Sequence, residues 1–312
     1  MDKTIVLFGI PGSELVGEIA AHLSGNIFPC RVLSMDAPFE GKPVSFAGGT
    51  VVWEGVDLMR ARAIFAESPA FSWPQRLLPD ERFLQKLTDN EWSVFQREAV
   101  SLMASVLGAA ALERPVINPP EAIHLSISPS IALDRLARGG LAVHPWRVEP
   151  APPEDSPGPA LVIDACGRDR WNSPRRPAAG ESALVFEPFS EAVATILVVG
   201  GAPVAALRWK AAESWAMWHN AGGPADGADR LESSDDFRNC SDAASLASRS
   251  AEILGLGFAA VTVRLSARAP SALLCEASPD LASWNRMFAG RVARALADYI
   301  ATVDRPFSAT SK

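Results

Sequence analysis

Cationic side chains that could bind an anion gather in one polar stretch of the sequence. Residues 166–180 are rich in arginine and proline, and they include Arg168, Arg170 and the pair Arg175-Arg176. A guanidinium group is planar and presents fixed N–H donors, so it can hold two oxygens of a phosphate at once. This stretch is therefore a candidate phosphate clamp.

The other residue types that commonly do chemistry form no recognisable motif. Four histidines lie apart in the chain: His22, His124, His144 and His219. No His-Glu-x-x-His pair and no Gly-x-Ser-x-Gly sequence occurs, which disfavours both a metalloenzyme and a serine hydrolase. Four cysteines are also well separated: Cys30, Cys166, Cys240 and Cys275. Without a Cys-x-x-Cys pair they predict reduced thiols rather than a zinc ribbon or a disulfide framework.

Composition and charge narrow the class of protein. The chain has 312 residues, of which 48% are hydrophobic and 21% charged, so it can bury a large core. The formal net charge of −7 disfavours a broad nucleic-acid-binding surface. No apolar run approaches the ~20 residues of a membrane span, and Met1-Asp2-Lys3 does not begin a signal peptide. We expect a cytoplasmic protein with neither a nucleic acid nor a membrane as partner.

The opening of the chain predicts a small α/β unit. Residues 3–8 are branched and aromatic, as in a strand, and Gly9-Ile10-Pro11-Gly12 separates them from an amphipathic helix at about Ser13–Leu23. The turn lacks the Gly-Lys-Ser/Thr and three-glycine motifs, so we interpret it as structural. Further expected elements are strands at 31–35 and 49–53 and helices between Pro79 and Leu112 that pack on this sheet.

The middle of the chain predicts a domain junction followed by a new domain. Pro115–Ala122 is typical of a short strand broken by two prolines, and a helix around Ile131–Arg138 ends at Gly139-Gly140. Residues 149–158 are dense in proline and acid and predict a loop. Leu161–Ala165 predicts a buried strand before the arginine-rich stretch.

The last third of the chain carries segments in a characteristic order. They are Leu184–Phe189, Ile196–Arg208, His219–Gly223, Leu254–Val263 and Leu273–Pro279. The third predicts an Asn-x-Gly-Gly turn and the last a Glu-x-x-Pro turn. This order resembles the carboxyl-terminal half of an ATP-grasp ligase of the RimK and glutathione-synthetase type. The family phrase Leu-Ala-Arg-x-Gly-Leu-x-Val-Pro is similar to Leu136-Ala137-Arg138-Gly139-Gly140-Leu141-Ala142-Val143-His144-Pro145, and the resemblance covers about residues 115–301.

The resemblance implies an α/β (α+β) fold in which two ATP-grasp subdomains close a cleft between antiparallel sheets. The implied divisions are an N-terminal α/β, pre-ATP-grasp-like domain at 1–118, a central subdomain at 119–186, a C-terminal subdomain at 187–303 and a tail at 304–312. Such ligases activate a carboxylate as an acyl phosphate, which an amine then displaces. Their site needs cations on the ATP phosphates and carboxylates on Mg²⁺.

Several positions depart from the family pattern. Ser128-Pro129-Ser130 and Asp164 stand where the family usually has phosphate-binding lysines. Thr262 replaces the aspartate of Gly-Val-Asp, Val193-Ala194-Thr195 replaces Asp-Leu-Arg, and Leu274-Cys275-Glu276 departs from Glu-x-Asn. An acid in place of a lysine reverses a contact worth ~4 kcal/mol at ~4 Å and an effective dielectric near 20. We therefore expect binding of ATP and Mg²⁺ to be weak or absent.

Other positions keep residues suited to a site. The implied roles are adenine contact for Glu187, a catalytic contact to phosphate or substrate for Arg208, a polar cofactor-binding turn for Asn220 and a metal ligand for Glu276. Arg168 and Arg170 are the candidate cofactor-binding cations in place of the lysines. The alternatives are a strand-end charge at Glu187, a surface ion pair at Arg208 and an ordinary turn at Gly222-Gly223.

Two hypotheses for the function follow. The first is a pseudoenzyme, an ATP-grasp protein with a degenerate site that binds a peptide, a small ligand or an active ligase partner without catalysis. The second is an active ATP-dependent carboxylate-amine ligase that modifies a peptide or amino acid, with arginines replacing the lysines. A peptide or a small carboxylate or amine is the expected ligand under either hypothesis, and a homodimer is a candidate assembly.

Overall fold

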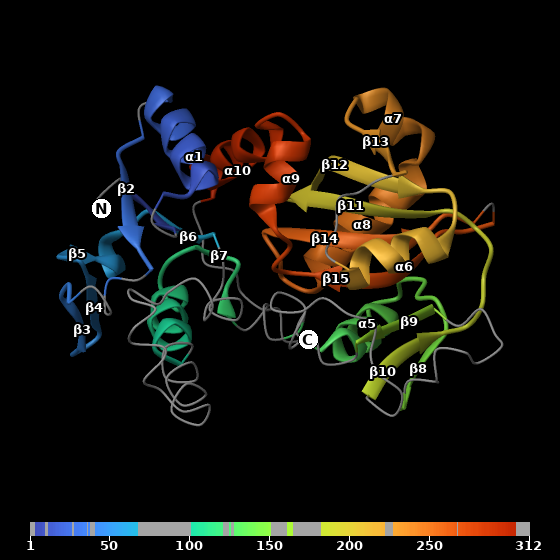
Figure 1. Ribbon diagram of the computed structural model, residues 1–312. Coiled ribbons are helices and arrows are strands. Elements are labelled where there is room, and N and C mark those ends of the chain that lie inside the picture. The colour runs from blue at the N-terminus through green and yellow to red at the C-terminus, as the bar shows by residue number, and fades with distance from the viewer. Residues whose placement is uncertain are drawn as a thin grey trace, which may run out of the picture. The chain divides into compact units, whose positions relative to one another are not determined.

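The computed structural model divides the chain into two compact units (Figure 1). It describes residues 4–9, 12–26, 28–35, 37, 41–67, 101–120, 125, 128–150, 161–164, 182–221, 227–266 and 268–303. Unit 1 combines Met1–Glu121 with Asp280–Lys312, and unit 2 is Ala122–Pro279. The chain therefore leaves unit 1 once and returns to it. No helix in the described part of the chain is long and apolar enough to cross a membrane.

Unit 1 is built on a four-stranded parallel sheet. Its strands, in spatial order, are β2 (Cys30–Ser34), β1 (Ile5–Gly9), β6 (Ala63–Ala66) and β7 (Val116–Ile117). Every residue of β1 is buried, as its apolar run predicts. Helix α1 (Glu14–Gly25) begins where the Ser13 hydroxyl accepts the Val16 N–H, so the predicted strand and helix are confirmed, and Ile10-Pro11 of the predicted turn lie outside the described residues.

A small antiparallel sheet and two returning helices complete unit 1. The sheet comprises β3 (Val44–Ala47), β4 (Thr50–Trp53) and β5 (Val56–Asp57), with the short helix η1 (Leu58–Arg60) after it. Helices α9 (Leu281–Met287) and α10 (Arg291–Thr302) both contact α1. Residues 101–111 are helical, as expected, whereas 79–100 lie outside the described residues.

Unit 2 contains a three-stranded antiparallel sheet and helix α5 (Pro129–Arg138). The strands, in spatial order, are β8 (Trp146–Pro150), β10 (Ser182–Phe186) and β9 (Leu161–Asp164). Proline at the first position and Gly140 at φ +79° after the end explain the limits of α5. The loop predicted at 149–158 is wrong for its first two residues, because β8 pairs with β10 as far as Pro150, and residues 151–158 lie outside the described residues.

Unit 2 also contains a five-stranded antiparallel sheet. Its strands, in spatial order, are β13 (Asp229–Leu231), β12 (Ala202–Trp209), β11 (Val193–Val199), β14 (Phe258–Arg264) and β15 (Ser271–Glu276). The β11–β12 hairpin turns at Gly200 and Gly201, which both have positive φ. Central strand β11 is buried along its whole length, as expected of an uninterrupted apolar run.

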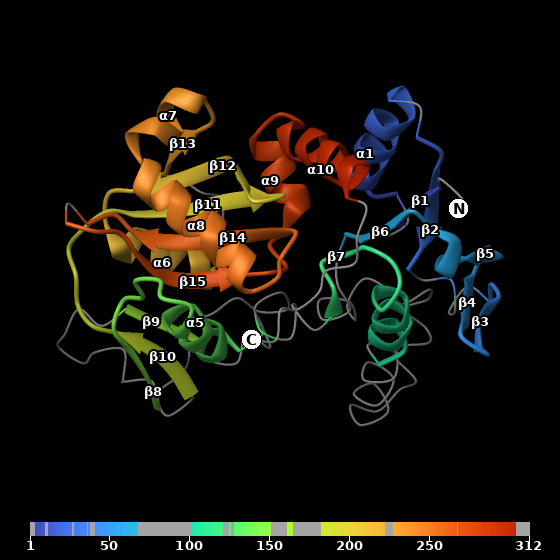
Figure 2. The same ribbon diagram turned by 180° about the vertical axis from the view of Figure 1, so that it is seen from behind.

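Helices cover both faces of this sheet. Helix α8 (Ser241–Ile253) contacts β11, β12, β14 and β15 on one face, and α6 (Ala212–Ala221) lies on the other (Figures 1 and 2). Short helix α7 (Ser234–Asn239) precedes α8.

Several features predicted from the sequence differ in the structure or fall on residues that it does not describe. The predicted turn at His219–Gly223 is wrong for its first three residues, because apolar and aromatic spacing continues α6 through Ala221. Gly222-Gly223, the 166–180 stretch and the 304–312 tail lie outside the described residues. The three-way domain division stays a prediction, and residues 280–303 group with unit 1 by their contacts.

Candidate functional site

The five-stranded sheet presents two chemically different faces. Successive residues of a strand point to opposite sides, and paired residues on neighbouring strands share a side. The threonine face comprises Thr195, Leu197, Leu207, Trp209, Thr262 and Leu274. The arginine face comprises Ala194, Ile196, Ala206 and Arg208. Ring contact between Trp209 and Trp218 places α6 on the threonine face.

Thr195 and Thr262 form a buried pair on the threonine face. They lie directly opposite each other on β11 and β14, their Oγ1 atoms are 3.0 Å apart, and both residues are 0% exposed. One hydroxyl donates to the other, so the contact carries no net charge. These are the positions at which the resemblance implies an arginine and a magnesium-binding aspartate. The pair joins the two strands and offers no carboxylate to a metal.

The remaining implied metal position gives little support to a magnesium site. Glu276 ends β15 on the same side as Thr262 and is half-buried, and its neighbour Leu274 is 1% exposed opposite Thr262. Among the described residues, no group of three or more His, Cys, Asp or Glu side chains is placed to hold a metal. Magnesium binds through oxygen ligands and usually takes carboxylates. The described donors therefore do not fit this ion.

The backbone of Glu187 is fully engaged within the chain. Its N–H donates to the carbonyl oxygen of Pro145 at 3.1 Å, and its own carbonyl accepts from Nε2 of His144 at 2.8 Å. The Glu187 side chain is exposed. Both backbone polar groups of Glu187 are therefore already hydrogen-bonded in this conformation, and its exposed side chain remains available for a contact with a ligand.

Helix α6 fills space between the two sheets of unit 2. It contacts β9 of the small sheet and β12 of the large one. Trp209 of β12 lies 4.9 Å from Trp218, and Trp215 lies 5.1 Å from His219, measured between ring centroids. The indole Nε1 groups of Trp209 and Trp215 are buried and find no acceptor among the described residues. Because both residues are 0% exposed, a ligand can reach these donors only if α6 moves.

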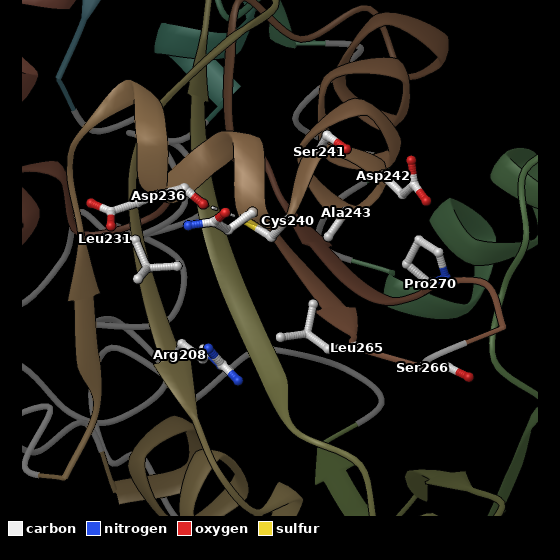
Figure 3. Close-up of a pocket in the computed structure, with 11 residues that line it drawn as sticks. Arg208, Leu231, Asp236, Cys240, Ser241, Asp242, Ala243, Leu265, Ser266 and Pro270 are labelled. Atoms are coloured by element: carbon white, nitrogen blue, oxygen red, sulfur yellow. Dashed lines mark hydrogen bonds between the residues drawn. The ribbon is translucent and has the colours of Figure 1, made fainter.

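Arg208 lies on the opposite face of the sheet, in a pocket of about 380 Å³ (Figure 3). Other residues of the lining are Leu231, Asp236, Asn239, Cys240, Ser241, Asp242, Leu265, Ser266 and Pro270. Arg208 is exposed and makes no ion pair or hydrogen bond to another described residue. Its guanidinium group is therefore a free cation at a concave surface within the described part of unit 2.

The acid and the thiol beside Arg208 are held by the α7–α8 junction. Asp236 closes a capping box with Ser233 and accepts the N–H groups of Ser233 and Glu232, which lowers the pKa of its carboxyl. The Cys240 thiol donates to the carbonyl oxygen of Asp236 at 3.3 Å. Burial raises the pKa of this thiol more than the charge of Arg208 lowers it, so Cys240 is a poor nucleophile.

The structure separates the residues that the sequence analysis singled out. Arg208 and Glu276 belong to opposite faces of the sheet. Asn220 is in the last turn of α6 rather than in a loop, and Asp164 lies in β9, within the strand predicted at Leu161–Ala165. Arg168 and Arg170 lie outside the described residues, so their predicted role stays a prediction. The α7–α8 junction was not predicted from the sequence, although the spacing Ser233-x-x-Asp236 is a recognised helix-capping signal.

His144 was treated as an isolated histidine in the sequence, but it lies in a structured cluster. It is 3% exposed, its Nδ1 lies 3.2 Å from Nη1 of Arg264, and its ring packs edge-on against Phe189 at 4.7 Å. Desolvation by burial lowers the pKa of His144, and the Arg264 charge lowers it further, although the hydrogen bond to Glu187 opposes this. The imidazole is therefore neutral near pH 7.

No family model matches the chain, and no curated protein sequence matches it. Solved structures do match over nearly its whole length. ATP-grasp ligase PsnB, complexed with a phosphomimetic variant of its minimal precursor, Mg and ADP, has a TM-score of 0.67 at 18% identity, covering 96% of this chain and 98% of that one. The Chryseobacterium gregarium RiPP-associated ATP-grasp ligase, in complex with ADP and a leader and core peptide, has a TM-score of 0.65 at 10% identity and 99% coverage of both chains.

A third match agrees with the type of ligase that the sequence resembles. The RimK domain protein ATP-grasp from Sphaerobacter thermophilus has a TM-score of 0.52 at 13% identity, covering 95% of this chain and 99% of that one. At these identities the likeness shows the fold and leaves activity to other evidence. The chain therefore has the fold of the RimK-like ATP-grasp ligases.

Proposed function

We propose that this protein is a non-catalytic ATP-grasp protein that binds a peptide. The observation that carries the proposal is the Thr195–Thr262 pair, which puts a neutral contact at the centre of the threonine face. A ligase of this fold must stabilise phosphate charge with metal and cations. A closed pair of hydroxyls supplies neither a carboxylate for the metal nor a cation for the phosphates.

Two further features support the loss of nucleotide binding. The backbone donor and acceptor of Glu187 are already used by Pro145 and His144. Aromatic side chains of α6 and β12 pack on the threonine face. ATP would have to displace both sets of contacts without the usual gain from magnesium and lysine, so its affinity should be low.

Peptide binding is supported by the neighbours and by the pocket. The PsnB and Chryseobacterium gregarium ligases were both solved with peptides bound. In this chain the pocket combines the exposed guanidinium of Arg208 with apolar surface from Leu231 and Leu265, and the carboxylates of Asp236 and Asp242 line it as well. Arginine binds carboxylates well, and the apolar surface suits neighbouring aliphatic side chains. We infer that Arg208 contacts an acidic residue of the peptide. A cytoplasmic location and a homodimer stay predictions.

Calorimetry with ATP tests the nucleotide part of the proposal. The protein is titrated with ATP in the presence and in the absence of Mg²⁺. We expect weak or no binding and no gain from the metal, because the described residues offer no magnesium site. Tight binding that depends on Mg²⁺ would overturn the non-catalytic proposal in favour of the carboxylate-amine ligase.

A fluorescent peptide tests the pocket. The probe is a labelled decapeptide of alternating Glu and Leu, and its comparison is the same peptide with Gln for Glu. Arg208→Ala should weaken binding of the acidic peptide by up to about fivefold, the scale of one partly solvated ion pair, and should not affect the Gln peptide. Arg294→Ala, an exposed arginine of α10, is the matched control. Equal losses for the two variants would place the peptide elsewhere.

A further inference from the structure

His144 is an addition to the family phrase that the chain otherwise follows. The chain reads Val143-His144-Pro145 where the phrase reads Val-Pro. A buried histidine needs hydrogen-bond partners for both ring nitrogens, because burial of an unpaired polar atom is unfavourable. His144 has both, and the proposed peptide pocket uses neither.

The partners of His144 fix its protonation state. Nε2 faces the carbonyl oxygen of Glu187, which only accepts, so Nε2 carries the hydrogen. Nδ1 faces Nη1 of Arg264, which only donates, so Nδ1 is a bare acceptor. The ring is therefore the neutral Nε2–H tautomer. A second proton on Nδ1 would replace a hydrogen bond with two facing N–H donors and two positive charges.

Aromatic walls complete the surroundings of this ring. Phe189 meets it edge-on at 4.7 Å, and Phe186 lies roughly parallel to it at 6.2 Å. We name this the imidazole site; it comprises Phe186, the Glu187 carbonyl, Phe189 and Arg264. The carboxylates of Glu187 and Glu191 also act on the ring and favour its charged form, and the Glu191 carboxylate is 4.0 Å from Arg264. The site thus offers one acceptor, one donor and two aromatic rings.

The backbone around His144 joins the two sheets of unit 2. The His144 N–H donates to the carbonyl oxygen of Ala272 on β15 at 2.9 Å, and the Ala272 N–H donates to Ala142 at 2.9 Å. On the other side, Pro145 accepts from Glu187 just after β10. Displacement of the imidazole would therefore loosen the contact between this segment and Glu187.

We propose that the neutral ring of His144 is a pH-sensitive latch: it bridges the Glu187 carbonyl and Arg264 while neutral, and it leaves the imidazole site when a second proton on Nδ1 faces the Arg264 donor. Departure of His144 frees the Glu187 carbonyl, so the neutral histidine acts as a latch on this segment. The lowered pKa of His144 is consistent with a site that prefers the neutral ring.

Chemical rescue of His144→Ala tests the site. The variant should melt below the wild type, and free imidazole at pH 8 should restore half or more of the lost melting temperature by binding the folded state. 1-Methylimidazole lacks the N–H donor and should restore little. His22→Ala, on α1 of unit 1, is the matched control. An imidazole shift for His144→Ala that is no larger than the shift for His22→Ala would overturn the proposal.

A second measurement on the wild type covers the case in which His144→Ala does not fold. Nitrogen-15 chemical shifts of the His144 ring should report the Nε2–H tautomer above neutrality. As pH falls and the ring takes its second proton, the protection of the Glu187 amide relative to its intrinsic exchange rate should decrease, because its partner Pro145 moves with His144. Unchanged protection through that titration would overturn the latch. Peptide affinity at Arg208 is a separate readout, so failure of one proposal is distinguishable from failure of the other.

Discussion

At the scale of residues, the threonine face shows how two neutral side chains can occupy positions that carry charges in the family pattern without leaving a buried charge unpaired. A single substitution at an Arg or Asp position would leave one charge buried without its partner, at a cost of about 3–5 kcal/mol. Thr195 and Thr262 avoid this because one hydroxyl donates to the other and neither side chain carries a charge. The two positions should therefore be energetically coupled.

A double-mutant cycle with valine tests this coupling. Valine has nearly the shape of threonine, so Thr195→Val or Thr262→Val leaves one buried hydroxyl without a partner, at about 1–3 kcal/mol. The double variant removes both hydroxyls and should lose less stability than the sum of the single changes. Urea unfolding of the four proteins measures the difference. Additive losses would contradict a direct hydrogen bond between the side chains.

Restoring one family residue alone should damage the protein. Thr262→Asp would place a carboxylate opposite the Thr195 hydroxyl at a fully buried position, so we expect a loss of about 3 kcal/mol or more at pH 8. Burial raises the pKa of that acid, and stability should recover partly as pH falls and the acid is protonated. Adding Thr195→Arg should lessen the loss. Thermal unfolding of both variants at two pH values measures it; an unaltered Thr262→Asp protein would mean that water reaches this face.

At the scale of elements, one amide side chain fastens the returning helices to unit 1. Asn285 of α9 is 4% exposed; its Nδ2 donates to Oε2 of Glu18 on α1 at 2.8 Å. Its Oδ1 accepts the N–H of Ala293 in the first turn of α10 at 2.9 Å. One residue therefore connects α1, α9 and α10, because its amide group has both a donor and an acceptor.

Asn285→Asp should break this junction in a pH-dependent way. The substitution removes the donor and places two carboxylates in contact, so we expect a loss of about 2–4 kcal/mol at pH 8. The loss should shrink in acid, where the two carboxyl groups can share a proton. Combining it with Glu18→Gln restores a donor and should recover stability at pH 8. Circular dichroism melts of the single and double variants provide the measurement, and no recovery would show that the junction acts through packing alone.

At the scale of the whole molecule, local sequence patterns predicted helices and strands better than they predicted which of them contact each other. The apolar runs of β1, β11 and β14 and the glycine limits of α5 were readable because each depends on a few neighbouring residues. The turn expected at Asn220 failed because tertiary packing of Trp215 and Trp218 extends a helix past a residue that favours turns.

The site was harder to predict because it depends on register and long-range contact. Thr195 and Thr262 are 67 residues apart, and His144 and Arg264 are 120 apart. Which face Arg208 shares with other residues follows from strand parity, and a shift of one residue would reverse it. The resemblance to ATP-grasp ligases selected candidate positions, and the structure was needed to show which of them meet.

The protonation of His144 makes the stability of the folded protein depend on pH. In the unfolded chain a histidine has a pKa near 6.5, and in the folded protein the pKa of His144 is lower. Between these two values the unfolded state binds more protons, so stability is complete above about pH 6.5 and falls as pH decreases, by up to about 1.4 kcal/mol per unit. His144→Phe keeps an aromatic ring but cannot titrate there. It should be less stable than the wild type at pH 8, because the Glu187 carbonyl and Arg264 lose their partner, and the gap should narrow toward about pH 5. Urea unfolding followed by tryptophan fluorescence gives both free energies across this range. A gap that stays constant would mean that His144 binds its proton equally well in the folded and unfolded chain, and that its burial is not maintained in solution.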